Sequence, residues 1–212
     1  MTENYFDAQT DSNGHEYVDL GLPSGTLWAT CNIGATKPEE YGNYYAWGET
    51  EPKDNYEVDT YKYANKNLFE LTTYCILKES GYNGFTDNLT ELQGSDDPAA
   101  ANWGGGWRTP SKTQWDELVA NTTHQWTTRG GKKGMLYTSK KNGQTLFLPA
   151  AGGRDDNLYA DGTDGFYWSR SLDAHKNDPW FFMINTMFDD ALISASRERE
   201  IGHSVRPVRS AR

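Results

Sequence analysis

The chain has few cysteines, no long apolar run and no surplus of positive charge. Two cysteines among 212 residues, Cys31 and Cys75, are too few to indicate a redox compartment; we interpret them as buried free thiols, with a single disulfide as the alternative. No apolar run approaches the roughly 20 residues that span a bilayer, so we expect no membrane insertion. Because the net charge is -10, we also expect no nucleic-acid partner, since phosphate binding depends on Lys and Arg.

Arrangements typical of catalysis are missing as well. The 4 histidines are scattered and do not show the paired spacing that puts two metal ligands on one helical turn. Ser169 lacks the flanking glycines of a nucleophile elbow. Gly104-Gly105-Gly106 lacks the Lys-Ser/Thr of a phosphate loop and instead predicts a tight turn beneath Trp103 and Trp107. We therefore predict that the protein is not an enzyme.

The acidic segment 155–164 deserves separate consideration as a calcium site. It gathers carboxylate and amide side chains around a glycine. Calcium prefers the oxygen atoms of such groups as ligands. Its spacing differs from that of an EF-hand loop, and the lectin triplets Glu-Pro-Asn, Gln-Pro-Asp and Trp-Asn-Asp do not occur. We interpret these side chains as solvated and expect no metal and no cofactor.

The composition indicates one globular domain with an aromatic core. A chain of this length can bury about 70% of its unfolded surface on folding, without needing disulfides or metal ions. The apolar fraction is only 36%, but 8 Trp, 13 Tyr and 8 Phe supply a large apolar area per side chain. We assign residues 1–15 to an N-terminal segment with the first hairpin and residues 16–212 to a single domain.

Strand and turn signals dominate the first half of the chain. Asn13-Gly14 and the alternating run 16–20 predict the first hairpin, and residues 27–33 predict another strand. Residues 38–67 have no sustained period, which predicts long ordered loops held to the core by aromatic side chains. The side chains assigned to this anchoring role are Tyr44, Tyr45 and Trp47.

Helices are predicted at two places. Residues 68–79 could form a short helix, although two adjacent threonines weaken it. Ser111 followed by Gln114 is a capping-box pattern, and Trp115, Leu118 and Val119 share one helical face. This pattern predicts a helix over residues 112–121.

Strands return after this helix. Residues 135–139 and 144–148 flank Asn142-Gly143, a strong hairpin signal, and Pro149 closes the second strand. Residues 180–187 and 202–208 predict two more strands. We assign Arg206 and Arg209, in the last of these, to the scaffold, where they would pair with acidic groups.

Several ordered motifs resemble one known family. The segment 17–35 (YVDLGLPSGTLWATCNIGA), followed by 45–50 (YAWGET), 103–111 (WGGGWRTPS), 167–169 (YWS) and 204–209 (SVRPVR), is similar to the Fibrobacter succinogenes major paralogous domain family of gut Bacteroidetes and their phages. That family resembles the formylglycine-generating-enzyme branch of the C-type lectin fold. The resemblance implies an alpha+beta fold that is C-type lectin-like, with a twisted antiparallel sheet, few helices and long ordered loops. The oxidase activity of that branch is not implied, because its late reactive cysteine pair has no counterpart after Cys75.

The chain also resembles the variable proteins of diversity-generating retroelements. In those proteins adenine-directed mutagenesis rewrites codons near the 3' end of the gene, and a scaffold holds the products in place. Residues 154–199 would form such a variable ligand-binding region between fixed motifs. The candidate ligand-binding residues are Asp155, Asp156, Leu158, Tyr159, Asp161, Asp164, Phe166, Arg170, Leu172, Asp173, His175, Asp178, Phe181 and Asn185.

Alternation along the strand at 180–187 divides its side chains between two faces. We assign Trp180, Phe182 and Ile184 to the core, and Phe181, Met183 and Asn185 to the binding face.

Two functions follow from these patterns. The first is a ligand-binding, receptor-recognition protein whose diversified C-terminal surface binds a protein or a glycan at a cell surface. The alternative is a non-variable structural or adhesive surface module. The first residues show no signal peptide, and either function suggests a surface-displayed or virion-associated protein. Oligomeric state, host and ligand identity stay open.

Overall fold

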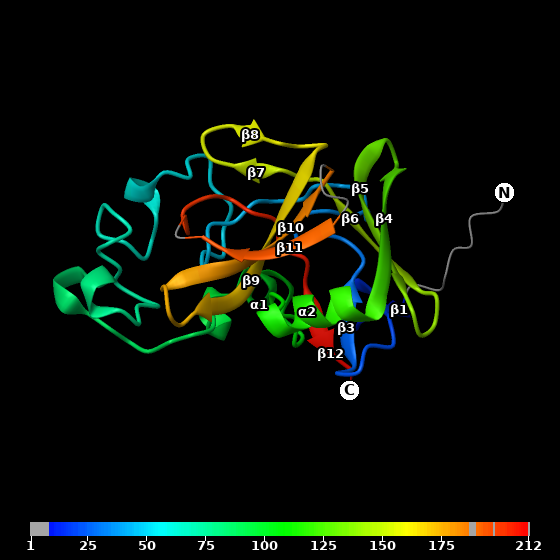
Figure 1. Ribbon diagram of the computed structural model, residues 1–212, viewed down its shortest axis with the longest axis horizontal. Helices are drawn as coiled ribbons and strands as arrows, with labels where there is room; N and C mark the ends of the chain where they lie inside the picture. Colours follow the sequence, from blue (N-terminus) through cyan, green and yellow to red (C-terminus); the bar gives the residue numbers. More distant parts are fainter. Residues whose placement is uncertain (1–8, 187–189, 197, 212) are drawn as a thin grey trace.

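In the computed structural model, antiparallel strands predominate and helices are few (Figure 1). The structure describes residues 9–186, 190–196 and 198–211. Within these residues there are two α-helices, α1 (Pro98–Trp103) and α2 (Lys112–Asn121). The 3-10 helices are η1 (Val58–Thr60), η2 (Lys78–Ser80), η3 (Tyr82–Gly84) and η4 (Gly94–Asp96). The strands are β1 (Gln9–Thr10), β2 (Glu16–Asp19), β3 (Thr26–Ala29), β4 (Thr122–Arg129), β5 (Lys132–Ser139), β6 (Thr145–Pro149), β7 (Gly153–Arg154), β8 (Leu158–Tyr159), β9 (Asp164–Asp173), β10 (Asp178–Asn185), β11 (Asp190–Ala195) and β12 (Val208–Ser210).

The first and last strands of the described chain lie in one sheet. Its order is β1-β2-β3-β12, and Val208 of β12 pairs with Trp28 of β3. The predicted first hairpin is confirmed: β1 pairs antiparallel with β2, and Gly14 closes the turn by donating its N–H to Asp11 O. Figure 1 accordingly shows the blue and red ends of the chain side by side at the bottom.

Helix α2 confirms the predicted helix and its capping box. The Ser111 hydroxyl accepts the Gln114 N–H, and the Gln114 side chain accepts the Ser111 N–H, so two otherwise unpaired N–H groups are satisfied. Trp115 and Leu118 on its inner face are both 0% exposed. The Trp115 ring stacks on Phe182 with 4.3 Å between centroids, which joins α2 to the sheet of β9, β10 and β11.

The long loops 38–67 are held in place by a second hydrophobic core, which includes Trp168, Leu172 and Val205. They are not held by the backbone hydrogen bonds of a sheet. The predicted anchors Tyr44, Tyr45 and Trp47 are confirmed, with 8%, 0% and 0% exposure. Two of them donate to distant carbonyls: Tyr44 OH to Ala151 O at 2.6 Å and Trp47 Nε1 to Ser169 O at 2.8 Å. Aromatic side chains with one polar group can thus replace secondary structure in holding a loop.

The predicted helix over residues 68–79 is wrong. The segment forms isolated bridges, Ala64 with Leu71 and Leu71 with Gly81, and ends in η2. Two observations explain this: Tyr74 has a positive φ of 53°, and the Asp87 carboxylate accepts the N–H groups of Tyr74 and Cys75. Those N–H groups are therefore not available for i to i−4 helical bonds.

Most predicted strands are found, with changed bounds. The hairpin around Asn142-Gly143 is confirmed as β5 and β6, and Pro149 is the last residue of β6. The strand predicted at 27–33 is the shorter β3, and the one at 202–208 is reduced to isolated bridges before β12. Strand β10 covers most of 180–187, while Met187 lies outside the described residues. Strands β4, β7, β8, β9 and β11 were not predicted.

The two C-terminal arginines belong to the scaffold, as expected, but only one pairs with an acid. Arg209 Nη1 lies 3.4 Å from Asp11 Oδ2. Arg206 is 0% exposed and donates instead to Asn32 Oδ1 and to the carbonyls of Ala29 and Thr30. Neutral acceptors thus bind Nε and Nη1, while the buried Nη2 has no hydrogen-bond partner among the described residues.

Both cysteines are free, which agrees with the first interpretation. Cys75 is fully buried and Cys31 is half-buried, and burial raises the pKa of both thiols. None of the helices within the described ranges is both long and apolar enough to cross a bilayer.

Candidate functional site

The sheet of β9, β10 and β11 has one face in the core and one face turned outward. Strand β10 lies in the centre and pairs antiparallel with both neighbours. Phe182 and Ile184 on its inner side are both 0% exposed and pack with Trp115 in the first core. Side chains alternate across a strand, so the residues between them point to the other side. That second side, formed by alternate residues of the three strands, is called the outer face below.

The outer face carries aromatic, apolar and polar side chains in register. Met183 lies between Phe166 of β9 and Leu192 of β11, and Phe181 lies between Trp168 and Ser194 in the next row. Exposure increases across the sheet, from Trp168 at 1% to Leu192 at 55%. Hence β9 is covered at this end, while β11 offers its side chains to solvent.

The division of strand β10 into two faces is confirmed except at one residue. Phe181, Met183 and Asn185 are half-buried and share the outer face, as predicted. Trp180 is only half-buried because the register with β9 shifts between Pro179 and Phe181. Instead of entering the core, its ring lies under Lys112 Nζ at 5.0 Å.

The β7–β8 hairpin places a second group of candidate residues beside the outer face. Asp155, Asp156 and Leu158 are exposed at its turn. The Tyr159 ring lies 5.9 Å from Phe166, which links the hairpin to the sheet. Asp161 follows it and is exposed, and Asp164 and Asn185 meet through a side-chain hydrogen bond at the edge of the sheet. The structure therefore gathers these candidates into one continuous surface.

The other candidates lie at the opposite end of β9 and β10, and two of them are better explained by the scaffold. Leu172 is a correction: it is 5% exposed and packs in the second core, because it points to the buried side where β9 passes the long loops. Arg170 donates to Thr109 O and Gln114 Oε1, which holds the start of α2. Asp173, His175 and Asp178 lie at the β9–β10 turn, away from the β7–β8 hairpin.

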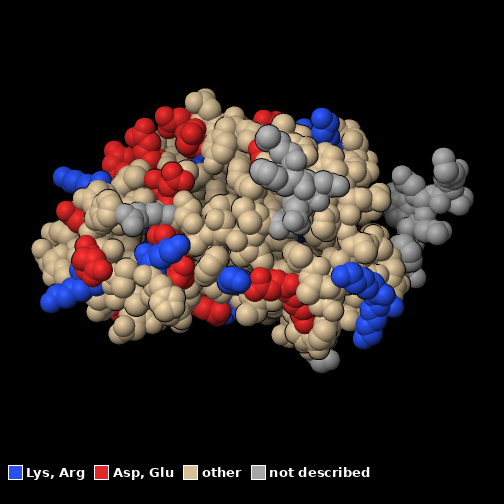
Figure 2. Space-filling view, in the orientation of Figure 1, with Lys and Arg blue, Asp and Glu red and all other residues tan. Residues whose placement is uncertain are grey.

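Two residues of the outer face were missed because β11 was not predicted. The strand reads Asp-Ala-Leu-Ile-Ser-Ala, in which polar and apolar residues do not alternate, so no periodic signal marked Leu192 and Ser194. Figure 2 shows mainly uncharged side chains over β10 and β11, with acidic side chains gathered at the upper left. No group of three or more His, Cys, Asp or Glu side chains comes together to hold a metal ion in the parts of the chain that the structure describes.

A buried histidine packs against the aromatic side chains of the outer face. His203 is 5% exposed, and its ring lies 4.1 Å from Trp168 and 5.3 Å from Phe166 between centroids. Burial among these rings lowers the pKa of His203 to about 3. The neutral imidazole therefore packs as one more ring among these side chains.

We predict that acid destabilises the protein through His203. The folded pKa of about 3 lies below the ordinary value near 6.5, so the stabilisation is complete above about pH 6.5 and is lost as the pH falls towards 3. The expected slope is about 1.4 kcal/mol per pH unit within that window. Urea unfolding of wild type and His203→Phe between pH 7 and 4 measures it. The wild type should lose stability relative to His203→Phe as the pH falls; parallel curves would show that His203 does not cause the loss.

We also predict that the outer face tolerates substitution better than the inner face. Leu192→Ala should change the free energy of unfolding by about 0.5 kcal/mol or less, because this side chain is already 55% exposed. Ile184→Ala on the adjacent strand should cost about 2–4 kcal/mol, because it empties a fully buried site. Urea denaturation compares the two. Equal losses would mean that Leu192 is covered in solution.

Comparison of the chain with protein-family models, with curated proteins and with solved structures found no match. Function is therefore inferred from the residues and their arrangement.

Proposed function

We propose that this protein is a ligand-binding protein that presents a diversified surface on a C-type lectin-like scaffold. The surface comprises the outer face and the β7–β8 hairpin, and its partner is a protein or a glycan at a cell surface. One observation carries the proposal: chemically miscellaneous side chains occupy the side of the sheet opposite the first core, and their exposure increases from Trp168, which packs in the second core, to Leu192. A rigid support with a variable surface suits recognition, because little order has to be gained on binding.

The scaffold part of the proposal rests on the family motifs and on where they lie. In the family that the sequence resembles, a tryptophan-and-arginine segment leads into a capped helix; here Trp107 is buried and the segment leads into the capped helix α2. Few helices, antiparallel strands and long loops agree with a C-type lectin-like fold. The turn of Gly104, Gly105 and Gly106 also agrees, since all three have positive φ between two tryptophans in edge contact.

The chemistry of the surface suits varied ligands. Tyr159, Phe166 and Phe181 offer rigid aromatic area, and aspartates of the hairpin offer adaptable hydrogen-bond acceptors, as antibody loops do. These residue types can be reached from an Asn codon by changes at its two adenines. Lys176, Met183 and Glu198 cannot, so they would be fixed positions within a varied region.

Sequencing the gene in sibling strains tests the proposal. We expect differences confined to adenines in the codons of residues 154–199, with residues 167–169 and 204–209 unchanged and a near-repeat of this stretch beside a reverse transcriptase. Differences should fall on outer-face and hairpin codons and spare those of buried Phe182 and Ile184. An invariant stretch without a repeat would contradict programmed variation.

One observation favours the alternative, a structural or adhesive surface module. Leu158 and Leu192 are 41% and 55% exposed beside half-buried aromatic residues, and such apolar patches often pack against another domain. In that case the same codons would be invariant among strains, and a neighbouring domain would cover Leu192. The backbone amides of β11 would then exchange hydrogen more slowly in the intact assembly than in the isolated chain.

A further inference from the structure

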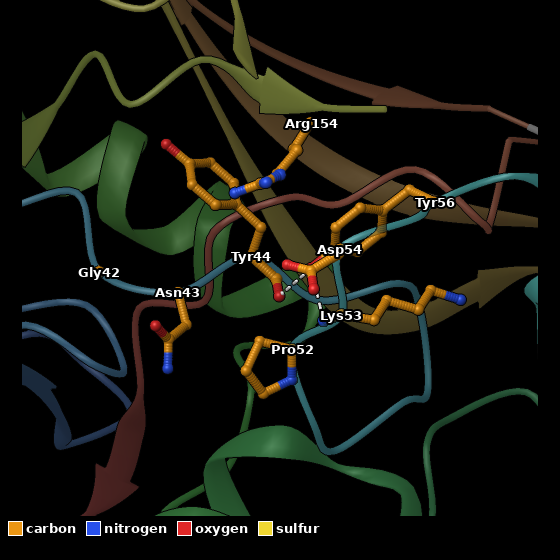
Figure 3. Close-up of a pocket in the computed structure, with 8 residues that line it drawn as sticks. All are labelled: Gly42, Asn43, Tyr44, Pro52, Lys53, Asp54, Tyr56 and Arg154. Atoms are coloured by element: carbon orange, nitrogen blue, oxygen red, sulfur yellow. Dashed lines mark hydrogen bonds between the residues drawn. The ribbon is translucent and has the colours of Figure 1, made fainter. Parts of the chain in front are cut away.

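A hollow of about 250 Å³ lies beneath β7, between the strand and the loops 42–44 and 52–56. Figure 3 shows Tyr44, Pro52 and Tyr56 around it, with the Arg154 side chain extending beside the Tyr44 ring. The hollow is smaller than the roughly 300–1,000 Å³ typical of sites for drug-sized ligands. It can therefore hold one group the size of a monosaccharide, but no large cofactor.

The two tyrosines supply apolar walls and no free hydroxyl. Tyr44 OH donates to Ala151 O and Tyr56 OH donates to Tyr44 O, each at 2.6 Å. Both bonds end on main-chain carbonyls, so they also fix the rings. Gly202 packs closely behind them, since a Cβ there would lie 2.8 Å from the Tyr56 ring and 3.0 Å from Tyr44 Cβ.

Arg154 is the cation of this hollow for which no ion pair is found among the described residues. Its backbone is fixed by two hydrogen bonds with Gly202, at 2.8 and 2.7 Å. Its Nε is buried and has no hydrogen-bond partner among the described residues. A ligand in the hollow would therefore meet the other N–H groups of the guanidinium, which are not buried and can donate to an acceptor from outside the chain.

The second cation of the hollow is already used. Lys53 Nζ lies 3.0 Å from Glu49 Oε2 and donates to Thr60 O at 3.1 Å. Figure 3 shows it pointing away from Arg154. An anion entering the hollow would thus meet a single planar guanidinium, which suits a carboxylate better than a multiply charged phosphate.

We propose that this hollow binds the carboxylate of an acidic sugar unit, such as a uronic acid. The carboxylate pairs with the guanidinium of Arg154, the sugar ring lies against Tyr44 and Pro52, and a ring hydroxyl can donate to the exposed Asp54 at the rim. Asp54 favours a ligand that carries hydroxyl donors, whereas a carboxylate alone would meet only repulsion there. The site is separate from the outer face, but Arg154 belongs to the β7–β8 hairpin of the surface proposed above, so the proposal requires the Arg154 codon to be a fixed position.

Titration of the ¹⁵N-labelled protein with sodium glucuronate, glucose or N-acetylglycine at constant ionic strength tests this site. We expect saturable shifts of the Gly42, Asn43 and Arg154 amide signals with glucuronate, with a Kd on the order of 1 mM, which corresponds to about −4 kcal/mol. Glucose, which lacks the carboxylate, should bind at least tenfold more weakly. N-acetylglycine, which lacks the hydroxyls, should also bind more weakly than glucuronate.

Two arginine variants complete the test. Arg154→Gln should weaken glucuronate binding at least tenfold. Arg129→Gln removes the same charge from a side chain of β4 that is 44% exposed, and it should leave glucuronate binding unchanged. Equal binding of glucose and glucuronate by the wild type would overturn the proposal without any variant, as would the absence of saturable shifts. Binding of N-acetylglycine as tight as that of glucuronate would reject the sugar and point to a peptide carboxylate. If Arg154→Gln does not fold, Arg154→Lys, which keeps the charge and loses the planar fork, should show a smaller loss.

Discussion

Asp97→Ala should lower the free energy of unfolding by about 3–5 kcal/mol, because it removes the acceptor for a set of buried donors. The Asp97 side chain is 0% exposed. It caps α1 by accepting the N–H of Ala99 at 2.9 Å, accepts the N–H and hydroxyl of Thr109, and pairs with Arg108 Nε at 2.8 Å. Without the carboxylate, the groups of Ala99 and Thr109 stay buried and unpaired, whereas Arg108, whose side chain is 38% exposed, keeps its bond to Leu92 O. One side chain therefore joins the end of the long loops to the segment that leads into α2.

Urea unfolding at neutral pH measures this effect, and two further variants define its cause. Asp97→Asn keeps one acceptor oxygen but loses the charge, so an intermediate loss is expected. Asp116→Ala removes a 48% exposed aspartate whose partner is Lys112 at 2.8 Å, and it should cost no more than about 0.5 kcal/mol. If Asp97→Ala cost as little as Asp116→Ala, the network would contribute no stability.

Trp115→Ala should destabilise the protein by a similar amount, about 3–5 kcal/mol, through loss of packing. The ring is 0% exposed, lies parallel to Phe182 within 3°, and its centroid is 4.7 Å from that of Trp28. Trp115 lies where α2, the sheet of β1, β2, β3 and β12, and the inner face of β10 meet. The cavity left by alanine would be shared by three elements, so none of them could close it alone.

Trp126→Ala is the matched control for this substitution. Trp126 on β4 packs against the same core but is only partly buried, so its removal should cost about 1–2 kcal/mol. Hydrogen exchange should further show that Trp115→Ala loses protection in β10, whereas Trp126→Ala does not. Equal exchange in the two variants would mean that α2 does not support the sheet beneath the outer face.

Parts of the fold with strong local signals were predictable. The capping box around Ser111 and Gln114 and the Asn142-Gly143 turn both depend on neighbours within a few residues, and both were found where expected. The predicted helix at 68–79 failed for the opposite reason. Its N–H groups are taken by Asp87, a partner that only the folded chain brings close.

The candidate site shows the same division. Alternation along β10 correctly separated Phe182 and Ile184 from Phe181 and Met183, because strand geometry alone imposes it. It could not reveal the bulge that moves Trp180 from the core, since a bulge depends on the partner strand β9. Nor could it show that Leu172 is covered, because the loops that bury it are distant in sequence.

By itself, then, the sequence determined an aromatic-rich chain of antiparallel strands, one capped helix and long loops, since composition and short-range patterns carry that information. Tertiary structure alone decided which side chains share the outer face and that Arg154 Nε finds no acceptor among the described residues. It also decided that the neutral ring of His203 packs against Phe166 and Trp168. These features depend on contacts between residues far apart along the chain, and such contacts leave no local pattern.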